Sequence, residues 1–265
     1  MNISVLASGS TGNATLVSEG DTHLLIDAGI SARRILDGMR GSGVTPEALT
    51  AILITHEHTD HIKGLEVLLR RTAATAYTIR PVADALCGEV PGIAPRLQVL
   101  ECDCAELIGA TAVTPFAVSH DSSGCCGWRI SGESGSFSSC TDLGVVTETV
   151  LAAVTGVDCA LIEANHDLTM LRTGPYPAFL KKRIRSEHGH LSNDDAASLA
   201  VYLAQNGTCA LVLGHLSRHN NTPGLALRTV QAALDAALEP EHMPSLFAAP
   251  ETGGLRLEIG AAVPC

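Results

Sequence analysis

The stretch Thr55-His56-Glu57-His58-Thr59-Asp60-His61 directly follows Ala51-Ile52-Leu53-Ile54, an apolar run that predicts a fully buried strand. Residues two apart in an extended chain point the same way, so His56 and His58 can hold one cation. Asp60 and His61 then enter the next helix and can face a second cation. Imidazole and carboxylate ligands suit zinc or manganese rather than calcium. We therefore expect two divalent metal ions, Zn or Mn, at this strand end; an exposed polar turn is the alternative.

Composition sets the broad class of the protein. The chain has 265 residues, 46% of them hydrophobic and 17% charged, which provides for one sizeable core and excludes general disorder. The sequence has no long repeat and no Pro/Ser-rich linker, so we expect residues 1–265 to form a single domain. The net charge of −11 argues against nucleic-acid binding over the whole surface and leaves only a local basic rim for that purpose.

Several features indicate a cytoplasmic protein. The first residues, Met1 to Leu6, lack the basic flank and long apolar centre of a signal peptide. No uninterrupted apolar run approaches the ~18 residues that span a bilayer, so we expect no membrane association. The nine cysteines are odd in number, lack a CxxC motif and indicate reduced thiols. For the pair Cys125-Cys126 the sequence suggests no function.

The order of predicted elements indicates an α/β fold. Short apolar runs predict strands at 3–7, 14–19, 23–27 and 51–54, with a helix at about 31–41. The segment from about 76 to 139 is strand-rich. Strands at 157–162 and 209–213 then alternate with helices near 146–153, 176–186, 193–205 and 223–237, and two short strands follow. This order favours two packed sheets with helices on their outer faces, a four-layer αββα sandwich.

A two-metal site needs more ligands, and polar residues at other strand ends are candidates. Asp27 and His120 each close an apolar run, and His215 follows a buried strand. Asp142 lies beyond another predicted strand, and its two oxygens could bridge two cations. Taken singly, each is more often a satisfied polar residue, and Asp27 could instead cap the helix near 31. Together with residues 56–61 they favour a dinuclear metal site.

This pattern resembles the metallo-β-lactamase superfamily. The motif HxHxDH at 56–61 is preceded by Asp27 and followed by His120, Asp142 and His215. These residues, in this order, are similar to the metal-binding signature of that superfamily. The resemblance implies its four-layer αββα fold. It also implies that His56, His58 and His120 hold the first metal and that Asp60, His61 and His215 hold the second. Asp142 would bridge the two metals, and Asp27 would orient the histidine loop from behind.

Four further segments are similar to the YycJ/WalJ-type proteins, bacterial cytoplasmic metallohydrolases related to ribonuclease Z and regarded as DNA 5′-exonucleases. They are Ser8–Asn13, Glu163–Asp167, Gly189–Asn193 and His215–Asn221. The resemblance implies that His190 protonates the leaving oxygen and that Glu163 orients it, a task that suits an imidazole. From the sequence alone, His190 could equally pack in the turn before the helix that Ser192 caps.

Candidate substrate contacts lie in two of these segments. The Gly-rich loop with Ser8, Ser10 and Asn13 offers backbone N–H groups and hydroxyls that could cradle a phosphate. The same residues also make a good turn, which is the alternative. Ser217 and Asn220 lie in the loop after His215, and we expect them to contact substrate as well.

Positive charge is placed unevenly. Four cations fall within five residues just before His190, namely Lys181, Lys182, Arg183 and Arg185, and Arg218 lies near His215. Two divalent cations would raise the net charge from −11 to about −7 and give the cleft a positive potential. A solvated helix face at 181–185 is the alternative. For stacking on bases, the isolated candidates are Trp128, Tyr176 and Phe179.

These features predict a dinuclear metal-dependent phosphodiester hydrolase, most simply a DNA 5′-exonuclease. The expected nucleophile is a hydroxide held between the metals, with Asp60, His190 and Glu163 as catalytic residues. The expected partner is nucleic acid, as single- or double-stranded DNA ends. A glyoxalase II-like hydrolase of small esters, thioesters or lactones shares the ligands and is an alternative, as is a non-catalytic module that binds nucleic-acid ends. Metal identity, DNA versus RNA, exo- versus endo-cleavage, cleavage polarity and oligomeric state stay open.

Overall fold

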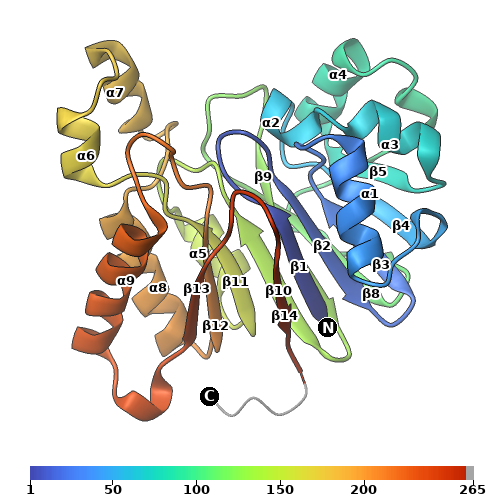
Figure 1. Ribbon diagram of the computed structural model, residues 1–265. Helices are drawn as coiled ribbons and strands as arrows, with labels where there is room; N and C mark the ends of the chain where they lie inside the picture. Colours follow the sequence, from blue (N-terminus) through green and yellow to red (C-terminus); the bar gives the residue numbers. More distant parts are fainter. Residues whose placement is uncertain (261–265) are drawn as a thin grey trace.

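The first of two sheets contains the N-terminal strands of the chain (Figure 1). The computed structural model describes residues 1–260. The sheet has the order β14-β1-β2-β3-β4-β5-β6. Its strands are β1 (Asn2–Ala7), β2 (Ala14–Glu19), β3 (Thr22–Ile26), β4 (Leu49–Leu53), β5 (Thr75–Ile79), β6 (Leu97–Leu100) and β14 (Leu255–Glu258). Strands β1 to β3 are antiparallel, and β3 to β6 are parallel.

The second sheet repeats this plan with the order β13-β12-β11-β10-β9-β8-β7. Its strands are β7 (Glu106–Ile108), β8 (Thr111–Ala117), β9 (Cys126–Gly132), β10 (Gly135–Cys140), β11 (Cys159–Glu163), β12 (Ala210–Gly214) and β13 (Ser245–Ala248). Strands β7 to β10 are antiparallel, and β10 to β13 are parallel. In each sheet the carboxyl ends of the parallel strands therefore lie at one edge, where ligand sites of α/β proteins form.

Helices cover the outer face of each sheet, so the predicted four-layer αββα sandwich is confirmed (Figure 1). On the first sheet lie α1 (Ala32–Gly41), α3 (Leu65–Arg71) and α4 (Arg80–Glu89). On the second lie α5 (Glu148–Val154), α8 (Asn193–Gln205) and α9 (Pro223–Ala237). The short helices α2 (Thr59–Ile62), α6 (Leu168–Thr173) and α7 (Ala178–Ile184) lie at the top of the view in Figure 1.

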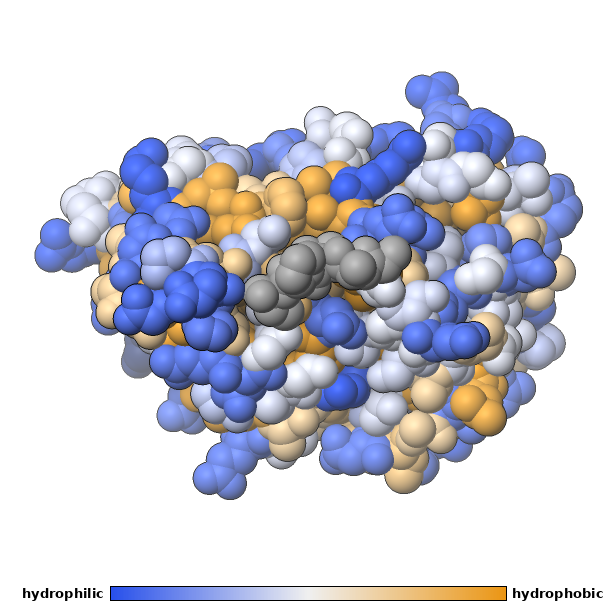
Figure 2. Space-filling model, turned by 90° about the horizontal axis from the view of Figure 1, so that it is seen from below, coloured by the Kyte–Doolittle hydropathy of each residue, from blue (hydrophilic) through white to orange (hydrophobic). Residues whose placement is uncertain are grey.

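Strand alternation divides the core into two clusters. In β11, Cys159 and Leu161 belong to the cluster that lies between the sheets, while Ala160 and Ile162 face the cluster under α8 and α9. Both faces of this parallel strand are covered, which explains its continuous apolar sequence. Seen from below, hydrophilic residues cover much of the surface, and hydrophobic residues are visible in groups between them (Figure 2). No helix within residues 1–260 is long and apolar enough to cross a membrane.

Two helices were not expected from the sequence. Helix α4 lies inside the segment predicted to be strand-rich, because β5 and β6 are parallel and need a crossover connection. Helix α6 is the second: Asp167 caps it by accepting a hydrogen bond from Met170 N at 2.7 Å. Helix α7, which follows it, is shorter than the predicted helix at 176–186. Each helix carries a local signal: Pro81 in the first turn of α4 and an aspartate just before α6.

The cysteines follow the expectation of reduced thiols in part. Within the described chain the free cysteines are Cys87, Cys102, Cys104, Cys125, Cys126, Cys140 and Cys159. Cys209, in contrast, is disulfide-bonded, so the expectation does not hold for it. Burial raises the pKa of the Cys125 and Cys126 thiols well above their usual value. These two thiols are therefore un-ionised at neutral pH, which makes them poor nucleophiles.

Candidate metal centre

The predicted ligands lie at the carboxyl ends of strands from both sheets. The 55–61 loop follows β4, and Asp27 follows β3 beside it. From the second sheet, Asp142 follows β10 and His215 follows β12. His120 follows β8, which runs in the same direction as β10 because β9 is antiparallel to both. The topology thus brings segments nearly 190 residues apart in sequence to one edge of the sandwich.

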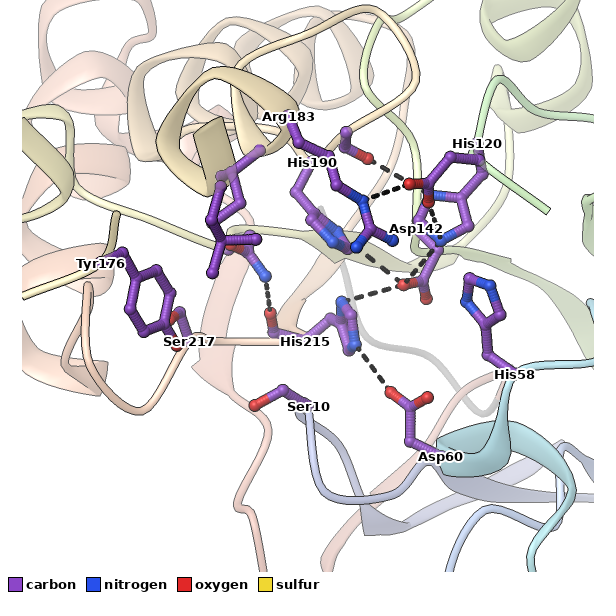
Figure 3. Close-up of a pocket in the computed structure, with 15 residues that line it drawn as sticks. Ser10, His58, Asp60, His120, Asp142, Tyr176, Arg183, His190, His215 and Ser217 are labelled. Carbon is purple, nitrogen blue, oxygen red and sulfur yellow. Dashed lines mark hydrogen bonds and ion pairs between the residues drawn. The ribbon is translucent and has the colours of Figure 1, made fainter. Parts of the chain in front are cut away.

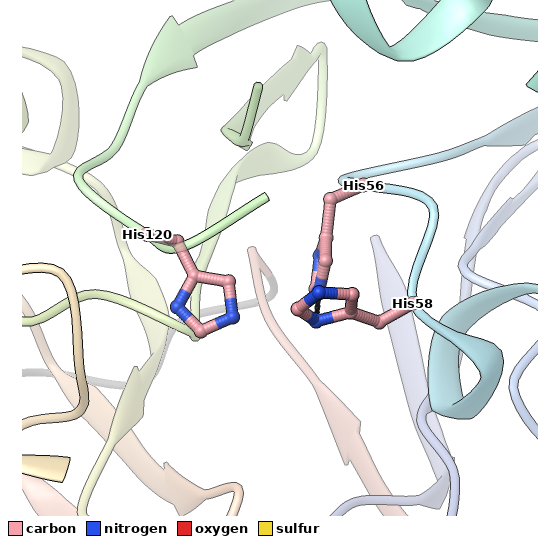
Figure 4. A group of neighbouring side chains, drawn as sticks. All are labelled: His56, His58 and His120. Carbon is pink, nitrogen blue, oxygen red and sulfur yellow. Dashed lines mark hydrogen bonds between the residues drawn. The ribbon is translucent and has the colours of Figure 1, made fainter. Parts of the chain in front are cut away.

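His56, His58 and His120 form the first group of candidate ligands (Figure 4). Each offers one ring nitrogen, and these nitrogens lie within 4.8 Å of one another. The Nε2 of His56 lies 3.0 Å from Nδ1 of His58. The other nitrogens of two rings are held by the protein: Nδ1 of His56 by the Thr55 hydroxyl at 3.0 Å and Nδ1 of His120 by the Gly189 carbonyl at 3.3 Å. The free nitrogens therefore converge.

Asp60, His61 and His215 form the second group. The Nδ1 of His61 lies 2.8 Å from the Asp27 carboxylate, and the Nδ1 of His215 lies 2.8 Å from the Glu163 carboxylate. These contacts leave the Nε2 of His215 facing the centre, while the Nε2 of His61 lies 3.3 Å from Asp142 Oδ2 and 3.0 Å from the Asn13 amide nitrogen. The Nε2 of His215 lies 3.6 Å from the Asp60 carboxylate, yet it is buried and has no hydrogen-bond partner within residues 1–260. A buried nitrogen in this position fits a cation as its missing partner.

Asp142 lies between the two groups (Figure 3). Its Oδ2 lies 3.3 Å from Nε2 of His61, and its Oδ1 lies 3.2 Å from Nδ1 of His215 and 3.8 Å from Nε2 of His120. Its Oδ2 is also buried without a hydrogen-bond partner in the described chain. Nitrogen and carboxylate donors with two such orphaned atoms fit divalent metal ions of the zinc or manganese type.

The charges of the buried groups are coupled. Burial alone would lower the pKa of His61, but Asp27 and Asp142 raise it well above its usual value. Burial likewise opposes protonation of His215, but Asp142 and its other acidic neighbours raise its pKa to about 10. For Asp142, burial raises the pKa, and His215 and His61 outweigh it and lower the pKa well below the usual value. In the absence of a cation these protons neutralise the buried carboxylates, and a bound metal ion would replace them.

The turns that carry these residues have unusual backbone conformations. Asp27, Asp142 and His215 have φ values of 58°, 59° and 53°, and within residues 1–260 the one other non-glycine residue with positive φ is Asp103. Such a conformation costs on the order of 1–3 kcal/mol, so surrounding contacts must hold it. At His215, the Asn165 amide donates to the backbone carbonyl at 2.9 Å, and the backbone N–H donates to the Ser8 hydroxyl at 2.9 Å.

His190 and Glu163 form the predicted pair beside this centre. The Nδ1 of His190 lies 2.8 Å from Oε1 of Glu163, while Oε2 accepts the backbone N–H groups of Leu143 and Leu191, each at 3.1 Å. Burial raises the pKa of Glu163, but His190, backed by His215, lowers it to about 2, so the carboxylate is ionised. Burial opposes protonation of His190, whereas Glu163 favours it, and the pKa of His190 is raised.

A pocket of about 350 Å³ opens over the candidate ligands (Figure 3). Of the five predicted substrate contacts, Ser10 and Ser217 line this pocket. Ser8, Asn13 and Asn220 are buried and do not line it. Asn13 instead holds the 8–13 loop together, because its Oδ1 accepts the Gly9 N–H at 2.9 Å. The loop in turn lies against the ligand helix, since Asn13 N donates to the Asp60 carbonyl at 2.8 Å.

Other contacts that shape the site were not predicted from the sequence. Thr55 connects Asp27 to the histidine loop, because its N–H and its hydroxyl both bond the Asp27 carboxylate. Glu57 points away from its ligand neighbours, as alternation along an extended chain predicts, and accepts the Ser123 N–H at 2.7 Å. Arg183 of α7 forms an ion pair with Asp121, which follows His120 in the chain. These contacts depend on tertiary structure. Alternation along the chain predicts the direction of Glu57, and no sequence motif predicts the other contacts.

The close approach at Gly29 gives a prediction on stability. A Cβ at this position would lie 1.5 Å from the Asp60 carbonyl oxygen and 2.7 Å from Asn13 N. Since backbone atoms cannot move aside like a flexible side chain, Gly29→Ala is expected to destabilise the protein by about 3 kcal/mol or more. The matched control is Gly88→Ala in α4, where a Cβ meets no atom within 4 Å and helix propensity predicts a gain of up to about 1 kcal/mol. Urea unfolding measures both; equal stability of the two variants would contradict the packing described here.

Comparisons with known proteins agree with this geometry. The family model of the beta-lactamase superfamily domain matches residues 22–215, more than two thirds of the chain. The protein named Exodeoxyribonuclease WalJ of Streptococcus pneumoniae serotype 2 (strain D39 / NCTC 7466) is 38% identical over 232 residues, 86% of each chain. The protein named Exodeoxyribonuclease YycJ of Bacillus anthracis is 34% identical over 238 residues, 89% of each chain.

The fold has a solved counterpart as well. The metallo-beta-lactamase fold protein YhfI from Bacillus subtilis aligns with a TM-score of 0.73 over 96% of this chain and 98% of that chain. At 17% identity this likeness concerns the fold alone. The resemblance seen in the sequence is thus confirmed: the chain belongs to the beta-lactamase superfamily, and within it to the family that includes WalJ and YycJ.

Proposed function

We propose that this protein is a metal-dependent phosphodiester hydrolase that shortens DNA from its ends, most simply from the 5′ end. One observation carries the proposal: protein acceptors hold one ring nitrogen of His56, His61, His120 and His215, and the other faces a shared centre beside the buried Asp142. This is the arrangement by which outer partners orient metal-binding histidines. The relatives named exodeoxyribonuclease support DNA as the substrate.

The proposed ligands serve two cations, zinc or manganese. His56, His58 and His120 would hold one, and Asp60, His61 and His215 would hold the other; Asp142, whose carboxylate lies within 3.8 Å of ring nitrogens of both groups, would contribute to both. Asp27 orients His61 through the 2.8 Å contact with its Nδ1. When bound, the two cations supply Lewis acidity to the phosphodiester and to water in the site.

The remaining chemistry belongs to side chains of this chain. His190 lines the pocket, and its Nδ1 contact with Glu163 keeps the ring oriented and favours its protonated form. We assign it the proton that goes to the departing 3′-oxygen. Asp60, whose side chain is 27% exposed, faces the same pocket and is placed to accept a proton from the attacking water.

Substrate contact is assigned by position around the pocket. Ser10 and Ser217 lie on its wall, so their hydroxyls can reach a phosphate or sugar oxygen. Ser8, Asn13 and Asn220 act one step further away by holding the two loops in place. Arg183 of α7 lines the pocket and adds a positive charge there, which suits a phosphodiester better than a neutral ester.

The competing function is hydrolysis of a small thioester, since acyl hydrolases can use the same ligand types. A side-by-side assay with bis-p-nitrophenyl phosphate, 5′-labelled DNA and a lactoyl thioester separates the two. We expect hydrolysis of both phosphodiesters and at least about a hundredfold lower kcat/KM for the thioester than for DNA, because the His190–Glu163 pair supplies a proton that the 3′-oxygen of DNA needs and a thiolate does not. Preferred cleavage of the thioester would overturn the assignment. Equal DNA binding with and without chelator, and no cleavage, would instead favour a non-catalytic binding module.

We also propose that residues 1–265 form one domain in the cytoplasm. The larger core cluster includes residues of both sheets, such as Ile52 and Trp128, which supports one folding unit. Seven of the eight cysteines in the described part of the chain are free, which supports a reducing compartment; the disulfide-bonded Cys209 departs from this pattern. Two separate unfolding transitions would argue against the single domain, and recovery of the protein outside the cytoplasm would argue against the location.

A further inference from the structure

The segment 168–185, here called the α6–α7 arm, includes α6, α7 and the residue that ends α7, and it forms one wall of the pocket. In Figure 1 the arm extends from the end of the molecule where the strand ends carry the candidate ligands. Its residues Tyr176, Leu180, Arg183 and Ile184 line the same pocket as the ligands. The wall is thus aromatic and apolar, with one cation. The cavity of about 350 Å³ is at the small end of the ligand pockets of proteins, which hold about 300–1,000 Å³.

Several contacts fix the arm relative to the centre. The Lys181 ammonium donates to the carbonyls of Arg172 at 2.8 Å and of Gly174 at 2.7 Å, so it joins α7 to the end of α6. Arg183 forms its ion pair with Asp121 on the loop that carries His120. The ring of Tyr176 lies edge to face with His219, with 5.6 Å between the ring centroids. Two of the four cations at positions 181–185, Lys181 and Arg183, are therefore engaged within the protein.

Of the other two cations, Lys182 lies on an outer ridge of α7 together with Phe179, and Arg185 directly follows the helix as its C-cap residue. Within residues 1–260, Lys182 and Arg185 take part in no ion pair, and both are exposed. Phe179 is 75% exposed, which is unusual for so large an apolar side chain. Lys182 and Arg183 follow it by three and four residues in the same helix, so the three share one face. Since Arg183 also lines the pocket, this ridge continues directly from the pocket rim.

We propose that the α6–α7 arm binds single-stranded DNA and leads it into the pocket. The terminal nucleotide lies against Tyr176, the next base stacks on Phe179, and the cations of Lys182 and Arg185 contact backbone phosphates. Exposed aromatics beside unpaired cations are the general means of binding a single strand. On a chain with a net charge of −11, free cations on this arm match a polyanion. The cavity of about 350 Å³ matches a single nucleotide, which favours a strand end that enters the pocket unpaired.

The inference rests on the proposed function, and binding measurements test it apart from cleavage. Fluorescence anisotropy measures the Kd for a single-stranded DNA 12-mer at several salt concentrations. The protein carries His190→Ala and is supplied with Mn²⁺, so that the strand stays intact during the measurement. K182Q/R185Q is expected to weaken binding by about tenfold and to reduce the slope of log K against log salt by about 1.4, which is about 0.7 for each phosphate that the variant no longer neutralises. The control R71Q/R228Q removes two exposed charges from α3 and α9, away from the pocket, and is expected to keep the slope.

A second variant tests the stacking contact. Phe179→Ala is expected to weaken single-strand binding about tenfold with the salt slope unchanged, because stacking releases no counterions. Leu107→Ala on β7, which is 79% exposed, is the matched control for the loss of an exposed apolar side chain. Circular dichroism and thermal melting establish that each variant is folded.

The outcomes separate the two proposals. Equal salt slopes for K182Q/R185Q and R71Q/R228Q would overturn the role of the arm, as would tighter binding of a blunt duplex than of the single strand. In the cleaving protein, K182Q/R185Q is expected to lower the ratio of single-strand cleavage to bis-p-nitrophenyl phosphate hydrolysis by about tenfold. A native protein that hydrolyses neither substrate contradicts the proposed function, while the binding slopes still decide the role of the arm.

Discussion

Alanine at position 58 is expected to lower hydrolysis of bis-p-nitrophenyl phosphate by at least about a thousandfold, since removal of a ligand exceeds the 10- to 100-fold effect of an outer partner. His58 is the cleanest ligand to remove, because its ring is partly exposed and contacts only other candidate ligands among the interactions of the described chain. His61, in contrast, is fully buried and bonded to Asp27, so its replacement would damage the fold as well. The variant is expected to melt within a few degrees of the native protein.

Three measurements check this result: kcat/KM, metal content after dialysis, and the melting temperature. We expect His58→Ala to retain less metal than the native protein, because one of three nitrogen donors is removed. The control is His242→Ala, which removes an exposed histidine from the short 240–242 helix, outside the pocket. Native activity and native metal content in His58→Ala would contradict the assignment of His58 as a ligand.

Replacing His190 by alanine is expected to lower kcat for DNA by about 10²–10⁴-fold while the metal content stays native, because general acid catalysis contributes about that much. The effect depends on the leaving group. The 3′-oxygen of a nucleotide is a poor leaving group that needs a proton, whereas p-nitrophenolate leaves as a stable anion. We therefore expect a much smaller loss with bis-p-nitrophenyl phosphate than with DNA.

The difference between the two substrates separates catalysis from support of the fold. His188→Ala is the control, since this exposed histidine lies close in sequence and bonds the Ser119 hydroxyl without lining the pocket. If His190→Ala slowed both substrates equally or released metal, His190 would be a structural residue and not the proton donor.

That the candidate ligands lie together could be predicted from the sequence, because the reasoning needs only the local order of strands and polar residues. Each candidate ligand lies in a short segment just beyond the carboxyl end of a strand, and strands that run in the same direction place these ends at one edge. This reasoning found Asp142 and His215, which the structure places within 3.2 Å of each other, although 73 positions separate them. The fold class followed from the same order of strands and helices, together with the resemblance to a known superfamily.

The parts that could not be predicted depend on how loops pack. Ser8 and Asn13 carry the polar atoms of a phosphate loop, but packing against His215 and the Asp60 helix turns them inward. The wall made by Tyr176 exists only because α6 and α7 fold back over the pocket, and nothing in the local sequence of Tyr176 specifies that approach. The periodicity of apolar residues shows which face of a helix or strand is buried, but it does not determine the direction of a side chain in a loop.

Anomalous diffraction from crystals soaked with Mn²⁺ tests the central claim most directly. The account predicts two strong peaks in each molecule, one bounded by His56, His58 and His120 and the other by Asp60, His61 and His215. Both peaks should contact the carboxylate of Asp142. A single peak, or peaks bound elsewhere on the acidic surface with this centre empty, would contradict a dinuclear hydrolase.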